Sequence, residues 1–236
     1  MTDEAHRRHR RRILVRTVAA VLVATAAVVG GPWVYAQFFV RDAPDPLTLT
    51  SPSPTAEAQV PSGPVDIDGT WQVQADSEAG YRLREVLSGQ EVVVVGRTPD
   101  VTGDVVIADG TMTDATVVVQ AGTISTDEAA RDAFFRRALD TSSFPEATFV
   151  LTEPVDVSAL GESPAPLAVT AVGELTFHGV TRPVTAELEA QRTPTGVEVV
   201  GQVPVTLADF DLAAPDLGWV VVDPTGTIEV RLSLAR

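Results

Sequence analysis

Cysteine, lysine and asparagine are all missing from this chain of 236 residues. Without cysteine the chain has no disulfide bond, no thiolate metal ligand, no cysteine nucleophile and no lipidated N-terminal cysteine. This absence does not indicate the cytoplasm, because a domain of this size buries enough surface to fold without disulfides. Without asparagine there is no acceptor for N-linked glycosylation. The missing residue types indicate a biased coding composition, and they exclude several kinds of chemistry.

Basic residues are scarce in most of the chain. From residue 66 to the C-terminus there are 10 arginines and 27 acidic residues, which gives this part a net charge of about −17. Six of the 17 basic residues lie before Thr17, where residues 6–12 read His-Arg-Arg-His-Arg-Arg-Arg. A strongly acidic domain is repelled by phosphate backbones, which excludes nucleic acid as a partner. The basic N-terminus instead has the position of a membrane topology signal.

Motifs for common enzyme chemistry are missing as well. The chain has no phosphate-binding loop, no dinucleotide-binding fingerprint and no Gly-x-Ser-x-Gly motif. His178 is the single histidine outside the basic N-terminus, and we expect it to be a turn residue with a local hydrogen bond. Glu187 and Glu189 alternate with apolar residues, which indicates a solvated sheet face rather than paired catalytic acids. We predict no catalytic residue, no metal ion and no cofactor.

One long uncharged segment stands out. Thr17–Val40 comprises 24 residues without a charge, and a bilayer core needs about 20. Trp33 and Tyr35 lie near its far end, where aromatic rings prefer the membrane interface. The positive-inside rule then places residues 1–12 in the cytoplasm as a basic tail, makes 13–40 a single transmembrane anchor, and places the rest outside the cell membrane. The alternative is a signal peptide cleaved near residue 36, which would release a secreted protein.

Proline, serine, threonine and alanine dominate residues 41–64, which include the run Ser-Pro-Ser-Pro at 51–54. A segment of this composition lacks the apolar residues needed to order itself. We therefore expect a disordered linker that holds the following domain, residues 65–236, at some distance from the membrane.

Alternation of apolar and polar residues predicts an antiparallel sheet in residues 65–236. The clearest strands lie at 67–75, 184–190, 197–205 and 227–234, and further strands are expected near 79–87, 91–97, 103–108, 114–123, 147–153 and 167–177. A hairpin turn is expected at 193–196. Asp127–Asp140 is the exception, because its apolar residues follow a helical period, with Ser125 and Glu128 as a capping box. The fold class is all-β: an extended antiparallel, lipocalin-like barrel of about eight strands with one short helix.

The inward positions of these strands are almost all apolar. We predict that a ligand contacts Trp71, Val73, Tyr81, Leu83, Val119, Phe134, Phe149, Leu151, Leu175, Phe177, Leu188 and Val199. An apolar interior of this kind is either a filled core or an open pocket. Several inward positions hold small residues, which favours the pocket: Gly69, Ala75, Ala171, Gly173, Ala186 and Gly201. The phenylalanines of the helix and Phe144 are expected to line the mouth or to pack the helix on the barrel.

Four segments in order resemble the YceI family of exported, lipocalin-like proteins. They are Val172–Val184, which reads Val-Gly-Glu-Leu-Thr-Phe-His-Gly-Val-Thr-Arg-Pro-Val, then Thr126 with Arg131-Asp132, Phe144-Pro145 with Phe149, and Ala208-Asp209-Phe210. The resemblance covers residues 66–236. It implies a barrel that holds a polyisoprenoid or isoprenoid-quinone-like chain inside. One departure is that the arginine and glycine that flank the last segment in the family are absent, and Asp211 stands in place of the glycine.

Together these features predict a lipid-binding protein of the cell envelope that carries or sequesters an apolar ligand. Its partners would be an apolar, lipid-like small molecule and, through the N-terminal segment, the membrane. A homodimer is a candidate assembly. The alternative function is a filled-core barrel that serves as a protein-interaction or envelope-structural module without a small-molecule ligand.

Overall fold

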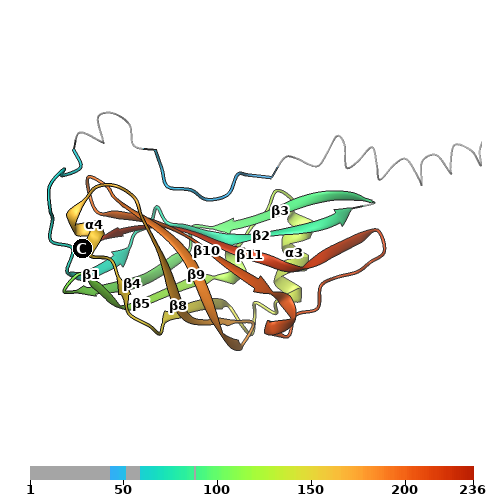
Figure 1. The fold of residues 1–236 in the computed structure, drawn as a ribbon. Helices are drawn as coiled ribbons and strands as arrows, with labels where there is room; N and C mark the ends of the chain where they lie inside the picture. Colours follow the sequence, from blue (N-terminus) through green and yellow to red (C-terminus); the bar gives the residue numbers. More distant parts are fainter. Residues whose placement is uncertain (1–42, 52–58, 88) are drawn as a thin grey trace, which may run out of the picture.

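Eight antiparallel strands form the closed wall of a β-barrel in the computed structural model, which describes residues 43–51, 59–87 and 89–236 (Figure 1). In spatial order the wall consists of β1 (Gly69–Val73), β4 (Val101–Ala108), β5 (Thr111–Gln120), β6 (Glu146–Leu151), β8 (Leu167–Phe177), β9 (Val180–Arg192), β10 (Val197–Thr206) and β11 (Val220–Ala235). The ring closes where β11 pairs with β1 through Gln72–Ala235 and Val73–Leu234. The predicted lipocalin-like barrel of about eight strands is confirmed.

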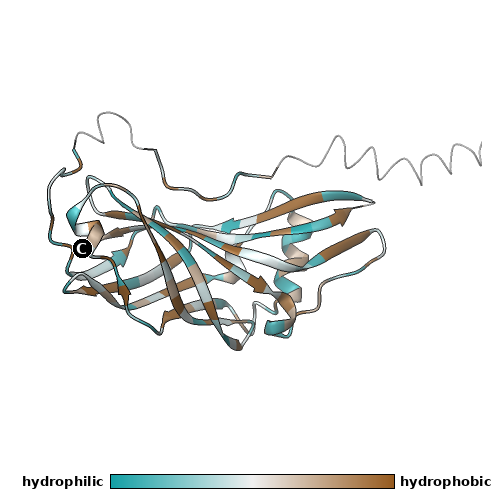
Figure 2. Ribbon diagram, viewed as in Figure 1, coloured by the Kyte–Doolittle hydropathy of each residue, from teal (hydrophilic) through white to brown (hydrophobic). Residues whose placement is uncertain are grey.

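Two further strands extend the sheet beyond the rim of the barrel. β2 (Glu78–Leu87) pairs with the first part of β11, and β3 (Gln90–Thr98) pairs with β2. β10 ends opposite residue 225 of β11, so residues 84–87, 90–93 and 220–224 project past the rim. We call these residues the ribbon. Figure 2 shows apolar stretches at the free ends of its strands. A short strand, β7 (Val155–Asp156), pairs with β5 and was not predicted.

Two helices mark the two ends of the barrel. α3 (Ala129–Ala138) lies beside the ribbon, and α4 (Ser158–Glu162) lies at the opposite end, near the C-terminus (Figure 1). We refer to these as the α3 end and the α4 end. The predicted helix at 127–140 is confirmed in α3, whereas the one-turn helix α4 was not predicted. Two 3-10 turns, η1 (Ala121–Thr123) and η2 (Leu207–Phe210), lie at the rim of the α3 end.

Residues 44–50, here called the strap, lie along the outer wall of the barrel (Figure 1). Arg82 Nη2 donates to the Pro44 carbonyl at 2.7 Å, and Arg97 Nη2 donates to the Asp45 carbonyl at 2.6 Å. Thr50 donates from its backbone amide and its hydroxyl to the Glu198 carboxylate, at 2.9 and 2.7 Å. The strap therefore crosses the outer face from β3 and β2 to β10.

The strap is a departure from the expected disordered linker. Composition alone suggested that residues 41–64 could not order themselves, but the barrel supplies the partners: arginine side chains hold two strap carbonyls, and Leu47 is only 5% exposed. Residues 44–50 lie on the barrel, so they cannot act as the spacer that was expected to hold the domain away from the membrane. The boundary of the linker at residue 64 stays a prediction.

No helix within residues 43–51, 59–87 and 89–236 is long and apolar enough to cross a membrane. The predicted basic tail at 1–12 and the predicted anchor at 13–40 both lie outside the described residues.

Candidate functional site

An apolar cavity of about 310 Å³ runs through the interior of the barrel. Its lining extends from Trp71, Leu160 and Leu234 at the α4 end to Phe134 and Leu212 at the α3 end. This size falls in the range of small-molecule pockets, roughly 300–1,000 Å³. The barrel therefore has an open interior, and the packed core lies around the cavity rather than across it.

Ten of the twelve predicted ligand-contacting residues line this cavity: Trp71, Tyr81, Leu83, Val119, Phe134, Phe149, Leu175, Phe177, Leu188 and Val199. The other two are outside the lining. Val73 ends β1 and packs against the core cluster where β1 meets β11, and Leu151 is buried in the same cluster opposite Gly173. Both belong to the inward series of their strands, as the alternation predicted, but neither side chain borders the cavity. The cavity lining does not include these two residues, and their predicted ligand contact stays a prediction.

The small inward residues act in two different ways. Ala171 and Ala186 are paired across β8 and β9, and both line the cavity, so their small side chains leave open space. At Gly173 the ring of Phe149 occupies the missing side chain's place, because a Cβ there would lie 2.4 Å from Phe149 Cζ. Gly201 lines the cavity, although Leu188 fills part of its side-chain space. The prediction that small residues create the pocket holds for the two alanines but not for Gly173.

Gly69 and Ala75 were also expected to open the interior, and neither lines the cavity. Gly69 begins β1 with a φ of +130°, which favours glycine, and Ala75 lies beyond the end of β1 and is exposed. The strand is shorter than the alternation indicated, so its first and last predicted inward positions fall outside the barrel wall.

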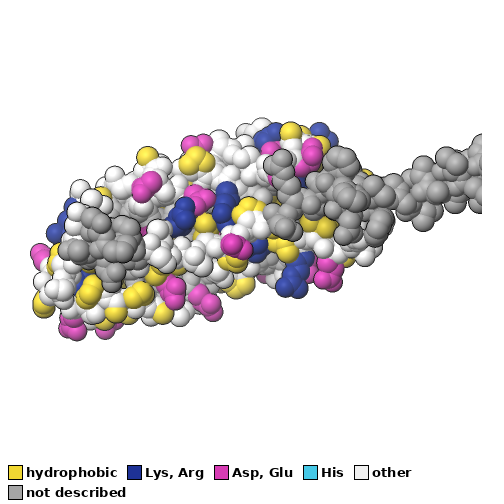
Figure 3. All heavy atoms as spheres, turned by 90° about the horizontal axis from the view of Figure 1, so that it is seen from above, with side chains coloured by type: hydrophobic (Ala, Val, Ile, Leu, Met, Phe, Trp, Pro, Cys, Tyr) yellow, Lys and Arg dark blue, Asp and Glu magenta, His cyan; other side chains and the backbone are white. Residues whose placement is uncertain are grey.

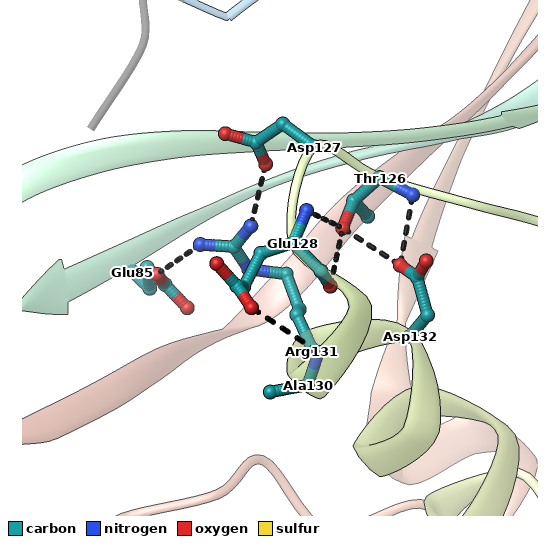
Figure 4. Close-up of polar contacts among 7 residues, drawn as sticks. All are labelled: Glu85, Thr126, Asp127, Glu128, Ala130, Arg131 and Asp132. Atoms are coloured by element: carbon teal, nitrogen blue, oxygen red, sulfur yellow. Dashed lines mark hydrogen bonds and ion pairs between the residues drawn. The ribbon is translucent and has the colours of Figure 1, made fainter. Parts of the chain in front are cut away.

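Charged residues in the lining are confined to the α3 end, where they are Arg82, Glu85 and Arg131. Arg131 Nη2 lies 3.5 Å from Glu85 Oε1, and Arg131 Nη1 donates to Asp127 at 2.7 Å (Figure 4). The cavity thus has an apolar length and one polar end. Glu85 was not among the predicted site residues, yet it continues the inward series of residues 79, 81 and 83 on β2. A buried acid in that series is the signal that could have identified it.

Tyr81 lies at the boundary between the apolar and polar parts of the cavity. Its ring stacks on Phe135 of α3, with centroids 4.6 Å apart and planes inclined by 15°. Burial raises the pKa of the Tyr81 phenol well above its usual range, and Arg131 opposes this shift only in part. The phenol therefore stays neutral and can donate a hydrogen bond to a polar group in the cavity.

We expect Tyr81→Phe to make the barrel less sensitive to alkaline pH. The free phenol loses its proton near pH 10 in the unfolded chain, while the folded chain keeps it to higher pH. Unfolding then releases a proton, so stability falls as the pH rises above about 10. The melting temperature between pH 9 and 11 should fall less steeply in the variant than in the parent chain. Equal slopes would show that Tyr81 titrates normally.

The start of α3 is fixed by contacts between Thr126 and Asp132 (Figure 4). Asp132 Oδ1 accepts from the Thr126 amide at 2.8 Å and from the Thr126 hydroxyl at 2.7 Å, while Glu128 caps the helix by accepting from the Ala130 amide. The expected capping box between Ser125 and Glu128 is wrong, because the amide of Ser125 donates to the Arg97 carbonyl in a bridge to β3. These contacts hold α3, and with it Arg131, against the polar end of the cavity.

Asp132→Ala should therefore loosen α3. The substitution removes both hydrogen bonds to Thr126, and loss of a helix-capping interaction costs about 1 kcal/mol. Urea unfolding should show this loss, and hydrogen exchange should show faster exchange of the α3 amides than of the barrel strands. Exposed Asp114→Ala on β5 is the matched control and should change neither measurement. Unchanged exchange in α3 would contradict this account of how the helix is held.

His178 is a turn residue, as predicted. It follows β8 with a φ of +50°, and its Nδ1 donates to the Phe210 carbonyl at 3.0 Å. Its ring contacts Phe144 edge-on, with centroids 5.2 Å apart. Phe144 packs over this turn and does not line the cavity mouth. Asp211, which replaces the expected glycine, has a φ of +56°, a left-handed conformation that aspartate tolerates better than most residues.

Comparison with known proteins bears on this arrangement. A family model described as the YceI-like domain matches residues 71–234. The chain belongs to the YceI family. A UPF0312 protein of Vibrio campbellii is 34% identical over 129 residues, which are 50% of this chain and 65% of that protein. A UPF0312 protein of Vibrio parahaemolyticus is 36% identical over 129 residues, which are again 50% of this chain and 65% of that protein. The chain thus matches slightly less than two thirds of the length of these curated relatives.

Solved structures of other proteins share the fold. A polyisoprenoid-binding domain from Saccharophagus degradans, implicated in plant cell wall breakdown, superposes with a TM-score of 0.54 and 19% identity, covering 70% of this chain and 97% of that domain. BcnA of Burkholderia cenocepacia gives 0.53 and 16%, covering 70% and 99%. At these identities the likeness shows the fold alone.

Proposed function

We propose that this YceI-family barrel binds a polyisoprenoid or isoprenoid-quinone-like lipid in its interior and carries or sequesters it without performing chemistry. The observation that carries the proposal is the apolar cavity with a single polar end at Tyr81, Glu85 and Arg131. A long apolar chain matches the first part, and a small polar headgroup matches the second. The polyisoprenoid-binding domain that shares the fold supports the same class of ligand.

The geometry gives the ligand a direction. The apolar tail would extend toward Trp71 at the α4 end, and the headgroup would stay near Arg131 at the α3 end. Phe134 at this end lines the cavity and is 44% exposed, which marks the cavity opening. Burial of apolar surface contributes about 25 cal/mol per Å², so a long chain can be held with few polar contacts. A uniformly apolar wall selects for tail length and width more than for chemical detail.

The proposed location is outside the cell membrane, with the N-terminus in the cytoplasm and residues 13–40 as a retained anchor. The 24-residue uncharged run and the basic cluster before it support this topology. Release after cleavage near residue 36 is the alternative. In both cases an apolar ligand has to be collected from a lipid phase, because isoprenoid chains of this kind do not dissolve in water.

Trp71 offers a direct test of ligand entry. The double variant Trp33→Phe/Trp219→Phe leaves Trp71 as the only tryptophan, buried at the α4 end of the cavity. We expect titration with isoprenoid quinones to quench its fluorescence, with longer tails more effective than short ones. Native mass spectrometry and lipid extraction of the purified chain should identify a co-purifying polyprenyl species. A bare mass together with unchanged Trp71 fluorescence would refute the proposal and favour a protein-interaction module.

A further inference from the structure

Large apolar side chains are exposed mainly at one end of this molecule. Eight such residues occur in the part of the chain that the structure describes, and seven of them lie at the α3 end: Val86, Val93, Phe134, Phe144, Leu217, Trp219 and Val221. The eighth, Val150, is on β6 in the barrel wall. Trp219 is the most exposed at 61%. Monomeric proteins rarely gather exposed apolar residues at one place without a binding role.

The centre of this group is the outer face of the ribbon and the loop that leads into it. Val86 and Val221 are directly paired across β2 and β11, so their side chains share one face. Leu217 and Trp219 lie in the residues immediately before β11. We call Val86, Val93, Leu217, Trp219 and Val221 the apolar tip. It lies next to the cavity opening, because Pro215 and Val222 in the same segments line the cavity.

The strap supplies a second and independent observation. Arg82 holds Pro44 near the rim of the α3 end, because Arg82 pairs with Thr227, two residues from the rim. Glu198 holds Thr50 farther toward the α4 end, because Glu198 pairs with Ser233. The chain therefore reaches the barrel from the α3 end. Four residue steps separate Val40, the last residue of the uncharged run, from Pro44, and they span at most about 14 Å.

From these two observations we infer that the apolar tip docks into the surface of a lipid bilayer. The inference rests on the proposed membrane anchoring. The short connection between Val40 and Pro44 keeps the α3 end, rather than the α4 end, next to the membrane. Tryptophan with neighbouring aliphatic residues is the composition that partitions into the bilayer interface. Docking would bring the cavity opening into contact with the lipid phase, so that the ligand could enter without crossing water.

Charge defines the kind of bilayer surface. Acidic and basic side chains are both spread over the face seen in Figure 3, and in the ribbon Glu91 is paired with Val86 and Arg84 with Val93. The domain carries a large net negative charge, which anionic headgroups repel. Docking is therefore driven by apolar contacts, and it should be stronger on zwitterionic phosphatidylcholine than on a surface rich in anionic lipid.

The absence of cysteine makes this inference directly testable by spin labelling. The full-length chain with Leu217→Cys, carrying a nitroxide label, is reconstituted into phosphatidylcholine vesicles, and Val150→Cys is the matched control on the barrel wall. We expect the label at 217 to be several-fold more accessible to oxygen than to a water-soluble nickel complex, and the label at 150 to show the reverse. Adding Trp219→Ser should reduce the lipid contact of the label at 217.

Three other outcomes would overturn docking. In the first, the chain sediments with the vesicles, but the label at 217 is as accessible to the nickel complex as the label at 150. The second is spin–spin broadening that disappears on dilution with unlabelled chain, which would assign the apolar tip to a second copy of this chain. The third is failure of the chain to associate with vesicles, which would remove the anchoring as well. None of these readouts involves the cavity, whereas Trp71 quenching reports ligand binding alone, so the two proposals can fail separately.

Discussion

Replacing Ala171 with phenylalanine is expected to abolish ligand binding while the barrel stays folded. Ala171 has no exposed surface and lines the cavity opposite Ala186 on the neighbouring strand, so a phenyl ring at this position would extend into the open interior. A long apolar chain could then no longer pass from the polar end toward Trp71. Quenching of Trp71 by isoprenoid quinones, measured in the single-tryptophan background, should be lost.

Stability distinguishes an open interior from a filled one in the same variant. In a filled core an added ring has no room, and overpacking costs typically about 1–3 kcal/mol. In an open cavity the ring buries its own surface without displacing neighbours, and cavity-filling substitutions often stabilise by about 0.5–2 kcal/mol. We therefore expect Ala171→Phe to unfold at an equal or higher urea concentration than the parent chain.

Ala168→Phe is the matched control, because Ala168 is an exposed position on the same strand, β8. It should leave both Trp71 quenching and the unfolding midpoint almost unchanged. If Ala171→Phe binds quinones as the parent does, the ligand does not occupy the middle of the barrel. If it unfolds at a much lower urea concentration, the interior is packed, and the interaction-module alternative gains support.

Strand positions could be predicted from the sequence because each strand has one face toward the interior and one toward water. Alternation fixed the inward side of β2, β8 and β10 correctly, and ten of the predicted contact residues do line the cavity. Alternation carries no information on how far a strand runs or which neighbour it meets. The ribbon arises because β2 continues past the rim together with β11, and no local pattern in residues 84–87 marks that point.

The polar end of the cavity was missed for a related reason. Glu85 and Arg131 come from β2 and α3, which are far apart in sequence, and both are charged residue types that are common on protein surfaces. Their meeting depends on α3 folding back against the ribbon. The strap was missed because its order depends on arginines of the barrel rather than on its own residues. Contacts between distant segments decide both features. The inward position of Glu85 could be read from the alternation on β2, but its partner Arg131 and the partners of the strap could not.

Glu229→Ala is expected to be the most destabilising single substitution on the outer wall. Glu229 is 2% exposed, and its carboxylate contacts Arg82 Nε at 2.7 Å and Arg97 Nη2 at 3.5 Å. The same two arginines hold the carbonyls of Pro44 and Asp45, so a single carboxylate contacts both of the cations that fasten the strap. Removing it leaves two partly buried positive charges together, and breaking a buried pair in this way costs about 3 kcal/mol.

Urea unfolding of the chain in mild detergent, followed by tryptophan fluorescence, measures this loss. Glu187→Ala on β9 removes an exposed acid from the same barrel and should change stability by less than about 0.5 kcal/mol. Glu229→Gln keeps a hydrogen-bond acceptor between the arginines without the charge, and it should fall between the two. A loss below about 1 kcal/mol for Glu229→Ala, the value of an exposed salt bridge, would show that water reaches the pair and that the strap does not cover it.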